Sequence, residues 1–279
     1  MLTEAHRPAL HQSSLAMLYR CPKQYEFRHI DGVIDPPGVA AAVGTGVHCA
    51  VDADLTHKIN EGALLPDDAI ADTARDGLNA VWEQGVVLGP DEREAGDAAT
   101  RGAAVDRAVA LAGLHHGTVA PGLNPTHVER EWRLTLEGYP YDLAGRMDIV
   151  EPDAIRDTKT SAKSPSKGMA DTSLQLTTYA VAARFTDGEL PPHLYLDYLV
   201  SLKTPKAVTL GTTRDDEDVA IFLRRLDIAM RQLGAGVFPP CNPCEWWCSP
   251  RWCGYWDKCP YVRGHATVTV TKEVKSDGQ

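Results

Sequence analysis

The most informative short segment of the sequence is GRMDIVEPDAIRDTK, residues 145–159. Pro152 and Asp153 suit the two central positions of a tight turn, because proline fixes φ and aspartate is common in turns. The residues on either side predict two strands, over 141–150 and 154–160. The segment therefore predicts a β-hairpin.

This hairpin brings two acidic residues face to face. With Pro152 and Asp153 as the loop, Asp148 pairs with Asp157, and their Cβ atoms are expected to lie about 4.5–5.5 Å apart. Like charges in this position destabilise a sheet unless a cation neutralises them, and Mg²⁺ prefers carboxylate oxygens. Lys159 projects from the same face as Asp157. Phosphodiester hydrolysis uses these groups, because a metal polarises the phosphoryl oxygen and a lysine offsets the developing charge.

The rest of the chain predicts alternating helices and strands within one domain over residues 1–264. We expect a helix from Ser13–Ser14, and a second helix that is entered through Gly44-Thr45-Gly46 and continues to about Ile59. A helical insertion is expected over 61–120, followed by a strand (128–136), a helix (171–185), a strand (193–202) and a helix (214–232). Residues 241–262 form a cysteine-rich segment, and residues 265–279 a polar tail.

Other polar side chains could complete a site around the hairpin. Gln175 and Tyr179 are four residues apart and so share one face of the predicted helix. His48 offers an imidazole, which is a good ligand for Mn²⁺ as well as for zinc. Glu131 on the strand before the hairpin is a further carboxylate, and Glu129 on the same face is the alternative.

Five cysteines lie within 19 residues, a density that indicates a metal site in a chain expected to be cytosolic. They are Cys241, Cys244, Cys248, Cys253 and Cys259. Zinc and iron–sulfur clusters both bind four thiolates, so the composition leaves both open, and the Cys241-x-x-Cys244 spacing favours zinc. A further cysteine, Cys21, lies near the other end of the chain.

The order of His48, Asp148, Asp157-x-Lys159 and Gln175-x-x-x-Tyr179 resembles the RecB-like branch of the PD-(D/E)XK nucleases. It is most similar to the CRISPR-associated and phage exonucleases of that branch, and the resemblance extends from Ser13 to Tyr261. It implies an α/β (α+β) fold with a mixed central sheet flanked by helices, a helical insertion, and an iron–sulfur segment that joins the two ends of the chain.

The resemblance also implies a role for each matching residue. The implied ligands of Mg²⁺ or Mn²⁺ are His48, Asp148, Asp157 and the carbonyl of Thr158. Lys159 is implied to be catalytic, and Gln175 and Tyr179 to bind DNA and organise the site. The implied ligands of a structural 4Fe–4S cluster are Cys21, Cys248, Cys253 and Cys259. Cys241 and Cys244 depart from the family pattern, so either could replace one of these ligands.

The implied activity is exonuclease action on DNA, with single-stranded ends as the expected substrate, in recombination, repair or the processing of foreign DNA. Recombination or CRISPR-type proteins are the expected partners. One alternative is a DNA-binding subunit of this fold that needs a partner for cleavage. Another is a zinc-binding interaction module, which leaves the facing of Asp148 and Asp157 unexplained.

Composition limits where such a protein acts. The net charge of −10 opposes non-specific coating of duplex DNA, although residues 155–170 carry four basic side chains against one acid. No apolar run is long enough to span a membrane, and the N-terminus lacks the features of a secretory signal. We therefore expect a cytoplasmic protein, either bacterial or encoded by a phage and acting in its host.

Overall fold

The computed structural model describes residues 7–262, which form two compact units. The core unit comprises residues 7–16 and 36–231, and the cysteine unit comprises residues 17–35 and 232–262. The one domain expected over 1–264 remains a prediction, and the tail predicted for 265–279 lies outside the described residues. No helix within residues 7–262 combines the length and the apolar character needed to cross a membrane.

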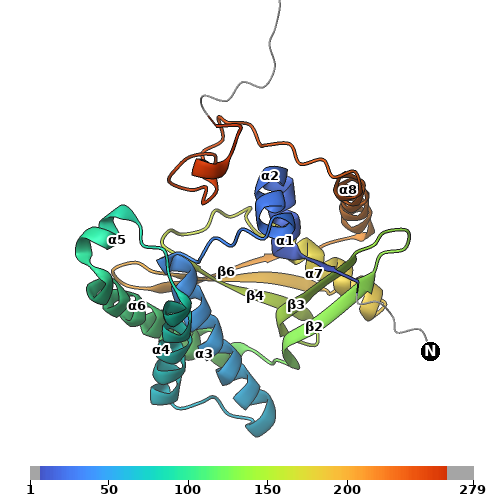
Figure 1. Ribbon diagram of the computed structural model, residues 1–279. Coiled ribbons are helices and arrows are strands. Elements are labelled where there is room, and N and C mark those ends of the chain that lie inside the picture. The colour runs from blue at the N-terminus through green and yellow to red at the C-terminus, as the bar shows by residue number, and fades with distance from the viewer. Residues whose placement is uncertain (1–6, 263–279) are drawn as a thin grey trace, which may run out of the picture. The chain divides into compact units, whose positions relative to one another are not determined.

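The core unit is built on a mixed six-stranded sheet, which confirms the predicted fold class (Figure 1). The strands are β1 (Ala9–His11), β2 (His127–Thr135), β3 (Asp142–Val150), β4 (Ala154–Ser161), β5 (His193–Val200) and β6 (Lys206–Thr212). Their order is β1-β3-β4-β5-β6, with β2 paired to β3. The β1–β3 and β4–β5 pairs are parallel, and the others are antiparallel. The sequence did not predict β1 or β6.

Helices flank this sheet. Those that lie within the core unit are α3 (Val39–Glu61), α4 (Asp67–Gln84), α5 (Pro90–Ala95), α6 (Asp97–Thr118), the short 3-10 helix η2 (Ala120–Gly122) and α7 (Leu174–Thr186). Ser173 caps α7, because its hydroxyl accepts a hydrogen bond from the Leu176 amide. Two helices cross the boundary between the units, namely α1 (Gln12–Arg20) and α8 (Asp216–Gly234). The cysteine unit contains α2 (Pro22–Tyr25), the π-helix η1 (Glu26–Ile30) and the 3-10 helix η3 (Trp256–Lys258).

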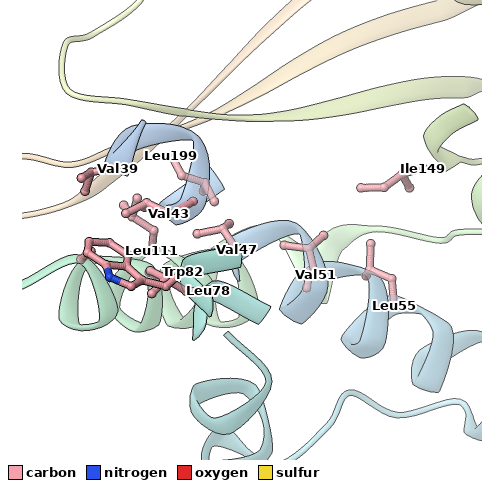
Figure 2. Close-up of a cluster of buried hydrophobic side chains, with 14 of the residues drawn as sticks. Val39, Val43, Val47, Val51, Leu55, Leu78, Trp82, Leu111, Ile149 and Leu199 are labelled. Carbon is pink, nitrogen blue, oxygen red and sulfur yellow. The ribbon is translucent and has the colours of Figure 1, made fainter. Parts of the chain in front are cut away.

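One apolar stripe on α3 organises the largest hydrophobic cluster. Val39, Val43, Val47, Val51 and Leu55 recur every four residues and are all buried. Figure 2 shows them beside side chains from the helical insertion and the sheet. The partners labelled there are Leu78 and Trp82 of α4, Leu111 of α6, Ile149 of β3 and Leu199 of β5. The cluster therefore fixes α3 between the insertion and the strands that carry the candidate site.

The helix α3 begins at Val39, so the prediction that it is entered through residues 44–46 is wrong. These residues lie inside the helix, and at Gly46 α3 crosses α4 at very short range. A Cβ atom on Gly46 would lie 2.6 Å from the Ala74 carbonyl oxygen, and one on Gly77 would lie 2.8 Å from the Cys49 sulfur. Glycine is needed here for close packing of two helices, and not for a turn.

Candidate active site

The hairpin has the register that the sequence predicts. Ile149 pairs with Arg156 and Val150 with Ile155, and continuing this ladder places Asp148 opposite Asp157. The loop is closed by a hydrogen bond of 2.8 Å from the Glu151 amide to the Ala154 carbonyl.

Asp148 lies where one edge of β3 loses its neighbour. β2 pairs along nearly the whole of one edge, whereas the other edge pairs with β1 as far as Ala144 and with β4 only from Ile149. Beyond this ladder, the Thr158 amide donates to Oδ2 of Asp148 over 3.2 Å. A side chain thus takes the place of a backbone acceptor, and the strands separate around the two carboxylates.

Tyr179 of α7 bridges these carboxylates. Its phenol oxygen lies 3.1 Å from Oδ1 of Asp148 and 3.2 Å from Oδ1 of Asp157. Gln175, one helical turn earlier, donates its amide to the same phenol oxygen over 2.8 Å. A phenol has one proton to donate, so it can form a hydrogen bond to only one of the two carboxylates at a time.

Lys159 provides the positive charge at this site. Its Nζ lies 2.7 Å from Oδ2 of Asp157, a residue with no exposed surface. Burial and the charge of Asp148 nevertheless raise the pKa of Asp157 to about 7, against the opposing effect of Lys159. Burial also raises the pKa of Asp148. The pair therefore favours the binding of a proton or a metal cation.

His48 of α3 reaches the carboxylates from the helical side. Its Nδ1 lies 3.6 Å from Oδ2 of Asp148. Burial lowers the pKa of His48, which favours the neutral imidazole that metals require. All the metal ligands expected from the sequence thus come together around Asp148.

Two acidic residues enlarge this set. Three possible ligand atoms, one from each of His48, Asp52 and Glu129, lie within 4.8 Å of one another. Burial, followed by the charges of Glu129 and Asp148, raises the pKa of Asp52 to about 8. Glu129 adopts a left-handed backbone conformation, with φ of 50°, and pairs with Arg146 over 2.8 Å.

Sequence reasoning missed Asp52, although it follows His48 by four residues, the spacing that places both on one face of a helix. The structure also separates the two glutamates of β2. Glu129 joins the site, whereas Glu131 is exposed and faces a depression that His11 and Trp132 help to line.

The cysteine unit gathers five thiols around one cavity. Cys21 comes from the N-terminal segment, and the others are Cys241, Cys248, Cys253 and Cys259. Burial, with the neighbouring thiols of Cys21 and Cys248, raises the pKa of Cys241 to about 12. Cys244 is exposed and does not line the cavity. The predicted ligand set is therefore assembled, with Cys241 as a fifth thiol beside it.

Comparison with known proteins gives the relationship. A crystal structure from Eubacterium rectale, described as a candidate exonuclease, is 15% identical, with 88% of each chain covered and a TM-score of 0.54. A second structure, of SSO0001, is 12% identical over 93% of this chain and 89% of the other, with a TM-score of 0.41. None of the curated proteins matches this chain.

The family model of the PD-(D/E)XK nuclease superfamily matches residues 9–260, which include most of both units and every candidate site residue. The mixed sheet and its hairpin agree with that match. The chain belongs to the PD-(D/E)XK nuclease superfamily.

Proposed function

We propose that this nuclease is a Mg²⁺- or Mn²⁺-dependent exonuclease that degrades DNA from single-stranded ends. The observation that carries this proposal is the convergence of Asp148, Asp157 and Lys159 at the open edge of β3. Two buried carboxylates beside one ammonium group suit phosphodiester hydrolysis better than a purely structural ion pair. An ion pair would need one acid, and the second costs stability unless a cation balances it.

A divalent cation fits these residues. The carboxylates of Asp148 and Asp157, the neutral imidazole of His48 and the Thr158 carbonyl together offer the oxygen and nitrogen donors that Mg²⁺ and Mn²⁺ accept. When bound, such an ion polarises the phosphoryl oxygen and lowers the pKa of a water.

The protein groups prepare the site for that chemistry. Tyr179 and Gln175 hold the two carboxylates in one orientation, because the phenol contacts both of them and the amide fixes the phenol. Lys159 carries a positive charge beside Asp157, where it can stabilise the charge that develops on the phosphate during attack by water.

We propose further that Cys21, Cys248, Cys253 and Cys259 hold a 4Fe–4S cluster. These four cysteines, from the two ends of the chain, line one cavity, so the four thiolates that such a cluster binds lie around a common space. The cluster would join residue 21 to residues 248–259 and so reduce the entropy of the unfolded chain.

The setting that fits this activity is the processing of DNA ends in recombination, repair or defence against foreign DNA. A cluster held by reduced thiols suits the bacterial cytoplasm or a phage-infected cell. We propose that its protein partners are recombination or CRISPR-type proteins.

The test uses linear and circular single-stranded DNA of the same sequence. Wild-type protein with Mn²⁺ should release nucleotides from the linear DNA and leave the circular DNA intact. Lys159→Ala should lose activity by about 10²–10³-fold. Lys203→Ala replaces an exposed lysine outside the basic stretch 155–170; it is the control and should keep the wild-type rate.

Two outcomes would contradict the proposal. Equal degradation of circular and linear DNA would exclude an exonuclease. A wild-type rate for Lys159→Ala would exclude the site.

A further inference from the structure

A buried amide in the cysteine unit contacts one of the clustered sulfurs. Gln24 of α2 is 6% exposed, and its Nε2 lies 3.2 Å from Sγ of Cys253. A buried glutamine is costly unless both ends of its amide are hydrogen-bonded. The way Gln24 satisfies both ends suggests a role beyond packing.

Arg20 determines which way this amide points. Its Nη2 lies 2.8 Å from the Oε1 of Gln24. A guanidinium group can only donate hydrogen bonds, so the oxygen of the amide must face Arg20. The NH₂ group is then left to donate to the sulfur of Cys253. The arginine charge also polarises the amide and strengthens it as a donor.

A second sulfur receives a hydrogen bond from the backbone. The amide of Cys241 donates to Sγ of Cys21 over 3.4 Å. Cys21 is also buried, with 6% of its surface exposed. One sulfur from each end of the chain thus accepts an N–H group in the cavity.

We propose that Arg20 and Gln24 form a positioning relay that raises the reduction potential of the cluster through the sulfur of Cys253. This inference rests on the proposed 4Fe–4S cluster. Reduction adds one electron, and the extra negative charge is shared by the ligand sulfurs. An N–H group aimed at a sulfur stabilises that more negative state, so it shifts the potential upward.

Three variants separate the parts of this relay. Gln24→Met keeps the length of the side chain and removes the donor, so the potential should become more negative. Gln24→Glu retains the contact with Arg20 but presents an acceptor to the sulfur, so its shift should be larger. Arg20→Met removes the group that orients the amide. Its potential should also become more negative, but by less than that of Gln24→Met.

Two residues of the same unit serve as controls. Gln232 donates its amide to the Val237 carbonyl over 2.9 Å, and Gln232→Met should leave the potential unchanged. Arg28 contacts the Asp35 carbonyl over 3.4 Å, so Arg28→Met removes a positive charge from the unit without touching Gln24. The potential should shift less in Arg28→Met than in Arg20→Met, because only Arg20 orients the amide. Equal shifts would indicate a general effect of charge.

The measurement is redox titration of the full-length protein, purified without oxygen, with iron and sulfide determined in each sample. The expected order of potentials is wild type, Arg20→Met, Gln24→Met and Gln24→Glu, from highest to lowest. Arg20→Met leaves Gln24 and every cysteine in the chain, so its potential decides the question even if Gln24→Met fails to fold. Iron-loaded variants with the wild-type potential would overturn the relay alone. A wild-type protein without iron would overturn the cluster together with the relay, whereas the nuclease site is tested separately through Lys159.

Discussion

The phenol oxygen of Tyr179 lies 3.2 Å from Oδ1 of Asp157, at the point where α7 reaches the open edge of β3. Both residues are almost fully buried. The contact links the helix that follows the hairpin to the hairpin itself. It gives the acidic pair a hydrogen-bond donor that does not titrate in the neutral range, because burial raises the pKa of Tyr179 well above its usual value.

Tyr179→Phe should therefore destabilise the metal-free protein by about 1–3 kcal/mol, because it removes the buried donor that the Oδ1 atoms of Asp148 and Asp157 share. Urea unfolding in the presence of EDTA measures this loss, and saturating Mn²⁺ should reduce it. Tyr198→Phe removes a hydroxyl that contacts the Met169 sulfur and should have little effect. Equal stability of Tyr179→Phe and wild type in EDTA would mean that the bridge contributes nothing.

The raised pKa of Asp52 predicts how stability depends on pH. An unfolded aspartate titrates near pH 3.9, so between about pH 4 and 8 the folded protein holds a proton that the unfolded chain has lost. The unfolding free energy of the metal-free protein should fall as pH rises through this window. Asp52→Asn should make that slope shallower, and the exposed Asp91→Asn should not. Urea unfolding in EDTA at pH 5.5 and pH 8 gives the comparison, and parallel slopes for Asp52→Asn and wild type would refute it.

The crossing of α3 and α4 predicts a strong effect of a single methyl group. Gly46→Ala would place its Cβ 2.6 Å from the Ala74 carbonyl, so the helices must separate. We expect a loss of about 1–3 kcal/mol in unfolding free energy and weaker Mn²⁺ binding, since His48 follows two residues later. Gly102→Ala on α6 meets nothing within 4 Å and should be neutral or slightly stabilising. Similar stabilities for the two variants, measured by thermal unfolding, would contradict the close packing.

The cysteines differ sharply in what their replacement should do. Cys248→Ser should lose the visible absorption of the cluster and lower the melting temperature, because the thiol lines the cavity. Cys244 is exposed and outside the cavity, so Cys244→Ser should keep both properties. Cys241→Ser should also keep the cluster if Cys21, Cys248, Cys253 and Cys259 are its ligands. If Cys241→Ser lost its iron while the serine variant of one of these four cysteines kept it, Cys241 would replace that cysteine as a ligand.

The hairpin was the part of the fold most fully predictable from sequence. A two-residue loop fixes the register, so Pro152 and Asp153 determine which residues of the two strands face each other. Glycine in a helix crossing was not predictable, because Gly46 has a role only in the presence of Ala74 on another helix. The strand β1 is only three residues long, from Ala9 to His11, too short for a periodic pattern.

The candidate site was predictable as far as local spacing determines it. The placement of Asp52 depends on α3 being continuous, and a loop assigned to residues 44–46 obscured its relation to His48. The choice between Glu129 and Glu131 depends on the local conformation of β2, where φ of 50° at Glu129 interrupts the regular strand. The position of Cys241 beside Cys21 joins segments that are 220 residues apart, beyond the reach of any local pattern.

The most direct test of the central claim measures Mn²⁺ binding and DNA degradation in the same preparations of Asp157→Asn and Asp153→Asn. Asp153 lies in the hairpin turn and is exposed, so it provides a matched control on the same hairpin. We expect Asp153→Asn to behave as wild type, and Asp157→Asn to bind Mn²⁺ at least about tenfold more weakly and to lose degradation of single-stranded ends. Unchanged Mn²⁺ affinity together with a wild-type rate of degradation in Asp157→Asn would contradict the central claim.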